Sequence, residues 1–157
     1  MDQDAFRETY REVNERACLF EKSILTNRCD CSHAERFCIA EREGVRCLSD
    51  DGQQRCARAL RILREQTHFA LRTHEDKAAL PHGKAMRIQV GGMRGIRALL
   101  DPDAEHLEPI SDVAELLTRA EQQYGDLRDM PYSRIMPHIV SYEVRSKRPR
   151  SSRRSPK

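Results

Sequence analysis

The chain has no tryptophan and few other aromatic residues, with four phenylalanines and four tyrosines among 157 residues. Hydrophobic residues make up only 38% and charged residues 34%, so we expect a modest core, which argues against a large β-sandwich. No stretch approaches the roughly 18 uncharged apolar residues that a membrane-spanning helix needs. The length suits about one domain. We therefore expect one soluble domain with no membrane span.

The first residues also lack the features of an export signal. Met1-Asp2-Gln3-Asp4 is acidic, and no basic region or apolar segment accompanies it. This predicts a cytoplasmic location, where thiols are kept reduced. The chain nevertheless contains six cysteines, all within its first 56 residues. In a reducing compartment they are interpreted as metal ligands, redox groups or buried thiols rather than as a disulfide framework.

The formal charge of +3 is unevenly distributed. Residues 145–157 hold seven Lys or Arg and no acid, so residues 1–144 carry 21 basic against 25 acidic residues, a charge of −4. The basic character therefore belongs to the C-terminal segment. That segment has nothing to bury, and we expect it to be a disordered basic tail.

The hydrophobic pattern predicts an all-α fold. Apolar residues from Phe6 to Ile24 recur at steps of four and three, typical of one helix with a buried stripe. A capping box, Ser32-His33-Ala34-Glu35, predicts a short helix over residues 33–43 that ends at Gly44. Ser49 is the expected N-cap of a third helix. We predict an antiparallel three-helix unit over residues 1–72, further helices of the same domain over 73–144, and the tail over 145–157.

The later segments are more ambiguous. Residues 86–100 fit a strand or a helix, and the lack of a partner strand favours the helix, in which Gly91, Gly92 and Gly95 would let another backbone approach closely. Ser111 is the expected N-cap of a helix that Gly125 ends. Residues 131–144 fit either a helix kinked at Pro137 or a strand.

The cysteines form the main candidate site. With a rise of about 1.5 Å per residue, Cys18, Cys38 and Cys56 would lie at similar heights in an antiparallel bundle. A fourth ligand would come from Cys29, Cys31 or Cys47. Since Cys31 and Cys47 bracket the predicted second helix, they are not expected to meet. His33 is a further candidate ligand, although a histidine at a helix start is more often solvated.

The chemistry of the site is inferred from the spacing. No CxxC pair is present, whereas structural zinc sites usually use cysteine pairs spaced by two to four residues. Dispersed thiolates suit an iron–sulfur cluster, such as a 4Fe–4S cube, which tolerates varied spacing. The primary hypothesis is a small protein that uses such a cluster in electron transfer, cluster delivery or redox sensing with a protein partner. The alternatives are a zinc-stabilised helical interaction subunit, a thiol redox switch, and cysteines that serve only as small core residues.

Other motifs carry less information. The glycine-rich segment 90–95 lacks the spacing of a phosphate-binding loop, and no catalytic triad can be assembled, so no enzyme activity is predicted. The remaining alternative is a nucleic-acid-associated regulator. It would use the tail as a salt-sensitive affinity arm, together with an arginine row on the third helix. The residues concerned are Arg148, Arg150, Arg153 and Arg154 of the tail, and Arg55, Arg58, Arg61 and Arg64 of the row.

Overall fold

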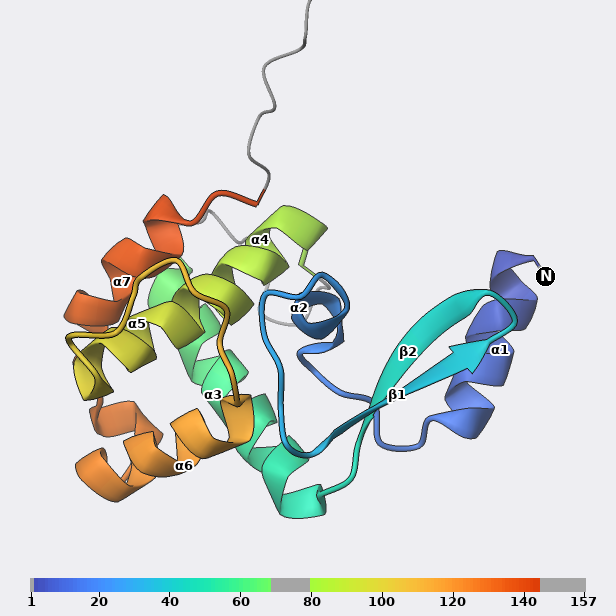
Figure 1. The fold of residues 1–157 in the computed structure, drawn as a ribbon, viewed down its shortest axis with the longest axis horizontal. Coiled ribbons are helices and arrows are strands. Elements are labelled where there is room, and N and C mark those ends of the chain that lie inside the picture. The colour runs from blue at the N-terminus through green and yellow to red at the C-terminus, as the bar shows by residue number, and fades with distance from the viewer. Residues whose placement is uncertain (1, 69–79, 145–157) are drawn as a thin grey trace, which may run out of the picture.

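A computed structural model describes residues 2–68 and 80–144 of the chain. These residues form mainly helices and one two-stranded antiparallel sheet (Figure 1). The elements in chain order are α1 (Gln3–Val13), α2 (Glu21–Leu25), β1 (Ala34–Ile39), β2 (Arg42–Cys47), α3 (Asp50–Thr67), α4 (His82–Met86), the π-helical turn η1 (Arg87–Gly91), α5 (Gly92–Leu100), α6 (Val113–Tyr124), the 3-10 turn η2 (Leu127–Asp129) and α7 (Tyr132–Ser141). Within this part of the chain, no helix is long and apolar enough to cross a membrane. The predicted disorder of the tail falls outside the described residues.

The mainly helical prediction is confirmed, but the predicted antiparallel three-helix unit is not present. The segment assigned to its second helix forms the β1–β2 hairpin, in which Ile39 pairs with Arg42 across a two-residue turn. Ala40 in that turn has a φ of 55°, a conformation in which hairpins usually place Gly or Asn. The capping box at Ser32 led to a wrong prediction of a helix. The hairpin could not be recognised in the sequence because its turn lacks the usual Gly or Asn.

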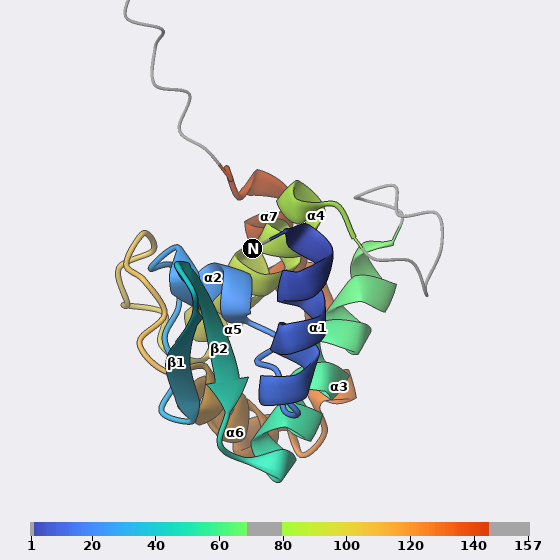
Figure 2. The same ribbon diagram turned by 90° about the vertical axis from the view of Figure 1, so that its right-hand side faces the viewer.

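The continuous first helix was also a wrong prediction. Helix α1 ends at Val13, and residues 16–18 pair with the end of β2 before α2 begins. No residue of α1 is buried. Instead, the Phe6 ring packs against Tyr10, which packs against Phe37 of β1. Helix α1 thus lies beside the hairpin (Figure 2), on the side away from the helical body (Figure 1). The apolar residues from Phe6 to Ile24 therefore do not form one helix face. Tyr10 contacts the hairpin, whereas Phe20 and Ile24 belong to the core.

Helices α3 to α7 follow the predictions more closely. The Ser49 side chain caps α3 by accepting from the Gly52 amide at 3.0 Å. Residues 82–100 are helical, with one π-turn, and residues 132–141 are a helix despite Pro137. Helix α6 is capped by Asp112 rather than by Ser111, and it ends at Gly125, whose φ is 81°.

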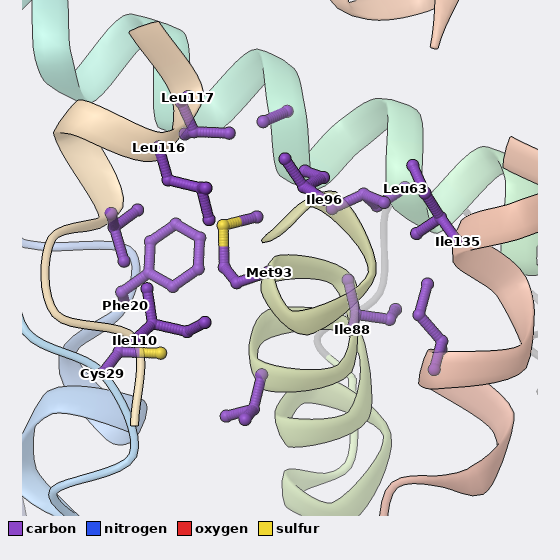
Figure 3. Packing of buried hydrophobic residues seen from close by; sticks show 14 of the residues in the cluster. Phe20, Cys29, Leu63, Ile88, Met93, Ile96, Ile110, Leu116, Leu117 and Ile135 are labelled. Carbon is purple, nitrogen blue, oxygen red and sulfur yellow. The ribbon is translucent and has the colours of Figure 1, made fainter. Parts of the chain in front are cut away.

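In the core, α2 and its flanking residues Phe20 and Cys29 pack against α3, α5, α6 and α7. Phe20, Met93 and Leu116 meet in its centre (Figure 3). The predicted close approach at the glycines is confirmed, because a Cβ at Gly91 would lie 2.7 Å from Ile139 Cα of α7. This packing places the N-terminus of α6 against the loop that carries Cys31, and the start of α3 against the loop that carries Cys18.

Candidate metal centre

Four of the six cysteines line one small pocket between the hairpin and the helical body. The four come from different segments, namely the loop before α2, the loop before β1, the last residue of β2 and the second turn of α3: Cys18, Cys31, Cys47 and Cys56. Each is partly buried, and all six cysteines of the chain are free thiols. The hollow between the side chains has a volume of about 20 Å³.

Backbone pairing positions Cys18 and Cys47. The Cys18 amide donates to the Val45 carbonyl at 3.0 Å, and the Cys47 amide donates to the Arg16 carbonyl at 2.8 Å. On its other side, Cys47 pairs with Ala34 of β1. The last residue of β2 is therefore held between the Cys18 loop and the start of β1. The hairpin brings Cys31 and Cys47 to one pocket, contrary to the prediction that they would not meet.

The Cys31 loop is attached to the start of α6. The Asp30 amide donates to the Ile110 carbonyl at 2.8 Å, and the Val113 amide donates to the Asp30 carbonyl at 2.9 Å. The Ser32 amide donates to the Asp112 carboxylate at 3.1 Å. These bonds join the loop before β1 to a segment about 80 positions later in the chain, which no local pattern could predict.

Helix α3 supplies Cys56 from its N-terminal half. The Gln53 side-chain amide donates to the Ala17 carbonyl at 2.8 Å, which ties the first turn of α3 to the residue before Cys18. His33 also lines the pocket, whose remaining wall is largely apolar and includes Leu19, Phe20, Ala34, Val113 and Ala114.

The thiols influence one another electrostatically. The pKa of Cys56 is raised to about 12, first by burial and then by the neighbouring thiols of Cys31, Cys18 and Cys47. Burial likewise raises the pKa of Cys18 to about 12, with further contributions from Cys31 and Cys47. Since the thiolate is the nucleophile, these buried groups are poorly suited to spontaneous thiol exchange at neutral pH. They would lose their protons on binding a metal.

Nearby backbone amides affect two of the thiols. The Phe20 amide acts to lower the pKa of the Cys18 thiol, and the amides of His33 and Ala114 act to lower the pKa of the Cys31 thiol. In both cases burial has the larger effect and raises the thiol pKa. Amide donors of this kind stabilise thiolates and tune iron–sulfur clusters.

The other two cysteines lie elsewhere. Cys29 is 3% exposed and belongs to the hydrophobic core beside Phe20 and Ile110 (Figure 3). Cys38 is exposed on β1. The predicted grouping of Cys18, Cys38 and Cys56 therefore fails at Cys38, because that residue lies on a strand and not on a helix of the bundle.

The four thiols surround the pocket without converging on one point. Within residues 2–68 and 80–144, no three His, Cys, Asp or Glu side chains are arranged to hold a single metal ion. A tetrahedral zinc site with Zn–S distances of about 2.3 Å would need its sulfurs within roughly 4 Å of one another. The thiols would thus have to rotate toward a single ion.

The arginine row on α3 is partly neutralised by acidic partners. Arg55 pairs with Glu121 at 3.1 Å and Arg58 with Asp126 at 2.7 Å, so these two side chains face α6 and the residue before η2. The four tail arginines named for nucleic-acid binding lie outside the described residues. That alternative remains a prediction.

Comparisons with protein families, curated proteins and solved structures find no match to this chain. Interpretation of the pocket therefore rests on the chemistry of its own residues.

Proposed function

We propose that the chain is a metal-binding protein that holds an iron–sulfur cluster through Cys18, Cys31, Cys47 and Cys56. The observation that carries the proposal is that these four thiols, from four separate segments, line one pocket. Four cysteine thiolates are the common ligand set of 2Fe–2S and 4Fe–4S clusters. A bound cluster would supply one-electron chemistry, which fits electron transfer, cluster delivery or redox sensing with a protein partner.

The surroundings of the thiols support a ligand role over the other uses of cysteine. Burial raises the pKa of Cys18 and Cys56 to about 12, which disfavours a thiol redox switch because such switches need accessible low-pKa thiolates. A purely apolar role does not account for the amides of Phe20, His33 and Ala114, which act to lower the pKa of Cys18 and Cys31. Those amides would compensate thiolate charge in a low-dielectric pocket.

Zinc is the second candidate, favoured by the small size of the hollow. A volume of about 20 Å³ suits one ion, whereas a cluster would require the cysteine side chains to rotate outward. The absence of a CxxC knuckle and the origin of the four thiols in separate segments favour the cluster. The same four residues serve either metal, with His33 as a neighbouring donor.

Metal analysis of anaerobically purified protein tests the proposal. We expect iron and acid-labile sulfide in equal amounts and a visible absorption band. Zinc at about one per chain, with no sulfide, would support the zinc alternative instead. Protein with no iron, sulfide or zinc, which also takes up neither metal in reconstitution, would refute the metal site.

Cysteine variants test which residues are the ligands. Cys31→Ser and Cys47→Ser should each lose most of the bound metal, because each removes one of four ligands. Cys38→Ser is the matched control, since Cys38 is an exposed residue of the same hairpin, and it should keep the metal content of the wild type. Equal metal loss in Cys38→Ser and Cys31→Ser would contradict the assignment.

A further inference from the structure

A second pocket lies between α5, α7 and the loop that joins α5 to α6. It is lined by several basic or polar side chains, including Arg28, Arg94, His106, His138, Tyr142 and Glu143. Its volume is about 350 Å³, within the usual range of pockets for small molecules. None of the cysteines of the candidate metal centre lines it.

Two residues that line this pocket each have a buried polar atom with no hydrogen-bond partner. Arg94 is 9% exposed and its Nε is unpaired, and Tyr142 is 4% exposed and its hydroxyl is unpaired. The Arg94 guanidinium lies 5.1 Å from the centroid of the Tyr142 ring. Buried polar groups in folded proteins nearly always have partners, so each exception calls for a ligand or an ordered water.

The close packing of two helices creates this arrangement. Gly91 lies against the His138 carbonyl, and Gly95 lies against Ile135, at distances that leave no room for a Cβ. The glycines thereby allow α7 to carry His138 and Tyr142 close to Arg94. The glycine-rich segment 90–95 contributes to this pocket through helix packing rather than through a phosphate-binding loop.

The pocket has an excess of positive charge. Arg28 and Arg94 line it, and Glu143 is the one acidic residue among the side chains found there. Arg97 donates to the carbonyls of His106 and Pro109, at 3.1 and 3.2 Å, and so holds the loop that carries His106. The His106 and His138 rings lie 5.0 Å apart. The pKa of His138 is lowered by burial first, and then by His106, Arg94 and Arg97, as expected in a positive environment.

We propose that this pocket binds a small oxyanion with more than one negative charge, such as a phosphate ester or a polycarboxylate. Since Arg94 Nε and the Tyr142 hydroxyl have almost no accessible surface in the free protein, both side chains would turn toward the anion to donate to its oxygen atoms, and Arg28 would contribute charge. Arginine is well suited to this role because its planar guanidinium matches carboxylate and phosphate geometry. The site goes beyond the proposed metal function and does not depend on it.

Calorimetric titration of the full chain with inorganic phosphate and with citrate tests the proposal, using sodium chloride of matched ionic strength as the control. We expect saturable binding of at least one of the two anions to a single site, with none for chloride. The preferred anion identifies whether phosphate or carboxylate groups are recognised. Absence of saturable binding for both would overturn the proposal.

Two variants test the residues. Tyr142→Phe removes only a hydroxyl that has no partner, so it should fold normally and bind the preferred anion about 3- to 10-fold more weakly. Tyr124→Phe, on α6 and outside the pocket, is the matched control and should bind as the wild type does. Arg94→Met should lower affinity at least about tenfold, since it removes a charged donor. Equal affinities of Tyr142→Phe, Tyr124→Phe and the wild type would overturn the assignment even if Arg94→Met failed to fold.

Discussion

Substitution of Gly91 by alanine tests the helix packing that underlies both the core and the second pocket. A Cβ at this position would lie 2.7 Å from Ile139 Cα and 2.8 Å from the His138 carbonyl oxygen. Both atoms belong to the backbone of α7, so no side chain can rotate away to make room. Helix α7 would have to move outward by about 0.7 Å for the closest contact to reach the ordinary 3.4 Å.

The size of the effect follows from two opposing contributions. Overpacking of a well-packed contact costs about 1–3 kcal/mol, occasionally more, and a rigid backbone neighbour places Gly91 at the upper end. Replacing glycine by alanine within a helix gains up to about 1 kcal/mol. We therefore expect a net loss of about 2 kcal/mol in the free energy of unfolding. For a chain of this size, that corresponds to a decrease in Tm of about 4–8 °C.

Thermal unfolding followed by far-ultraviolet circular dichroism measures this change, with the metal content of each sample determined in parallel. The matched control is Gly83→Ala in α4, where a Cβ would meet its nearest atom, Val144 Cγ2, at an ordinary 4.0 Å. The control should be as stable as the wild type or slightly more stable. A Gly91→Ala protein with unchanged or higher Tm would contradict the predicted overpacking, as would an equal loss of stability in the control.

Three further predictions concern the buried thiols and one buried hydrogen bond. In metal-free protein, iodoacetamide should modify exposed Cys38 at least about tenfold faster than buried Cys29, as followed by mass spectrometry, and equal rates would contradict their placement. Ser23→Ala should lower the free energy of urea unfolding by about 1–3 kcal/mol, because Ser23 donates to Gln89 Oε1 at 2.5 Å in the core; an unchanged unfolding midpoint would contradict this. Burial raises the pKa of three thiols from 9.0 to about 12: Cys18, Cys29 and Cys56. Between these pH values the folded metal-free protein keeps thiol protons that the unfolded chain loses, so its free energy of unfolding should fall as the pH rises from about 9 toward 12. The decrease is at most about 1.4 kcal/mol per pH unit for each thiol. Metal-loaded protein should instead lose stability as the pH falls, since protons compete for the thiolate ligands, and urea unfolding of both forms across the pH range distinguishes the two cases.

The candidate metal centre could be predicted only in part. Cysteine content predicts a metal site, and this stays a prediction; Cys18 and Cys56, which the sequence predicts to lie close together, both line one pocket. Cys38 was wrongly included because the segment around it was assigned to a helix. By the register of the hairpin, Cys38 and Cys47 share a face, but Cys47 pairs with Ala34 at the open end and lines the pocket, whereas Cys38 lies four residues along β1, near the turn, where its side chain is exposed.

The second pocket could not have been predicted from local patterns. Arg94 is one of two arginines in the largely apolar helix α5, and its neighbour Tyr142 is about 50 positions later in the chain. The glycines between residues 90 and 95 did predict a close backbone approach. They did not indicate which helix would approach, or that a histidine and a tyrosine would come with it.

Features that depend on near neighbours in the chain could be predicted from local sequence. Helix caps such as Ser49, the stop at Gly125 and the amphipathic pattern of α6 act within a few residues, so their physics is local. Features that depend on pairing between distant segments appear only in the folded chain. Pairing of residues 16–18 with β2 divides the first helix, and attachment of the Cys31 loop to Asp112 completes the four-cysteine pocket. These contacts join segments tens of residues apart, and they arise only when the whole chain packs around one core.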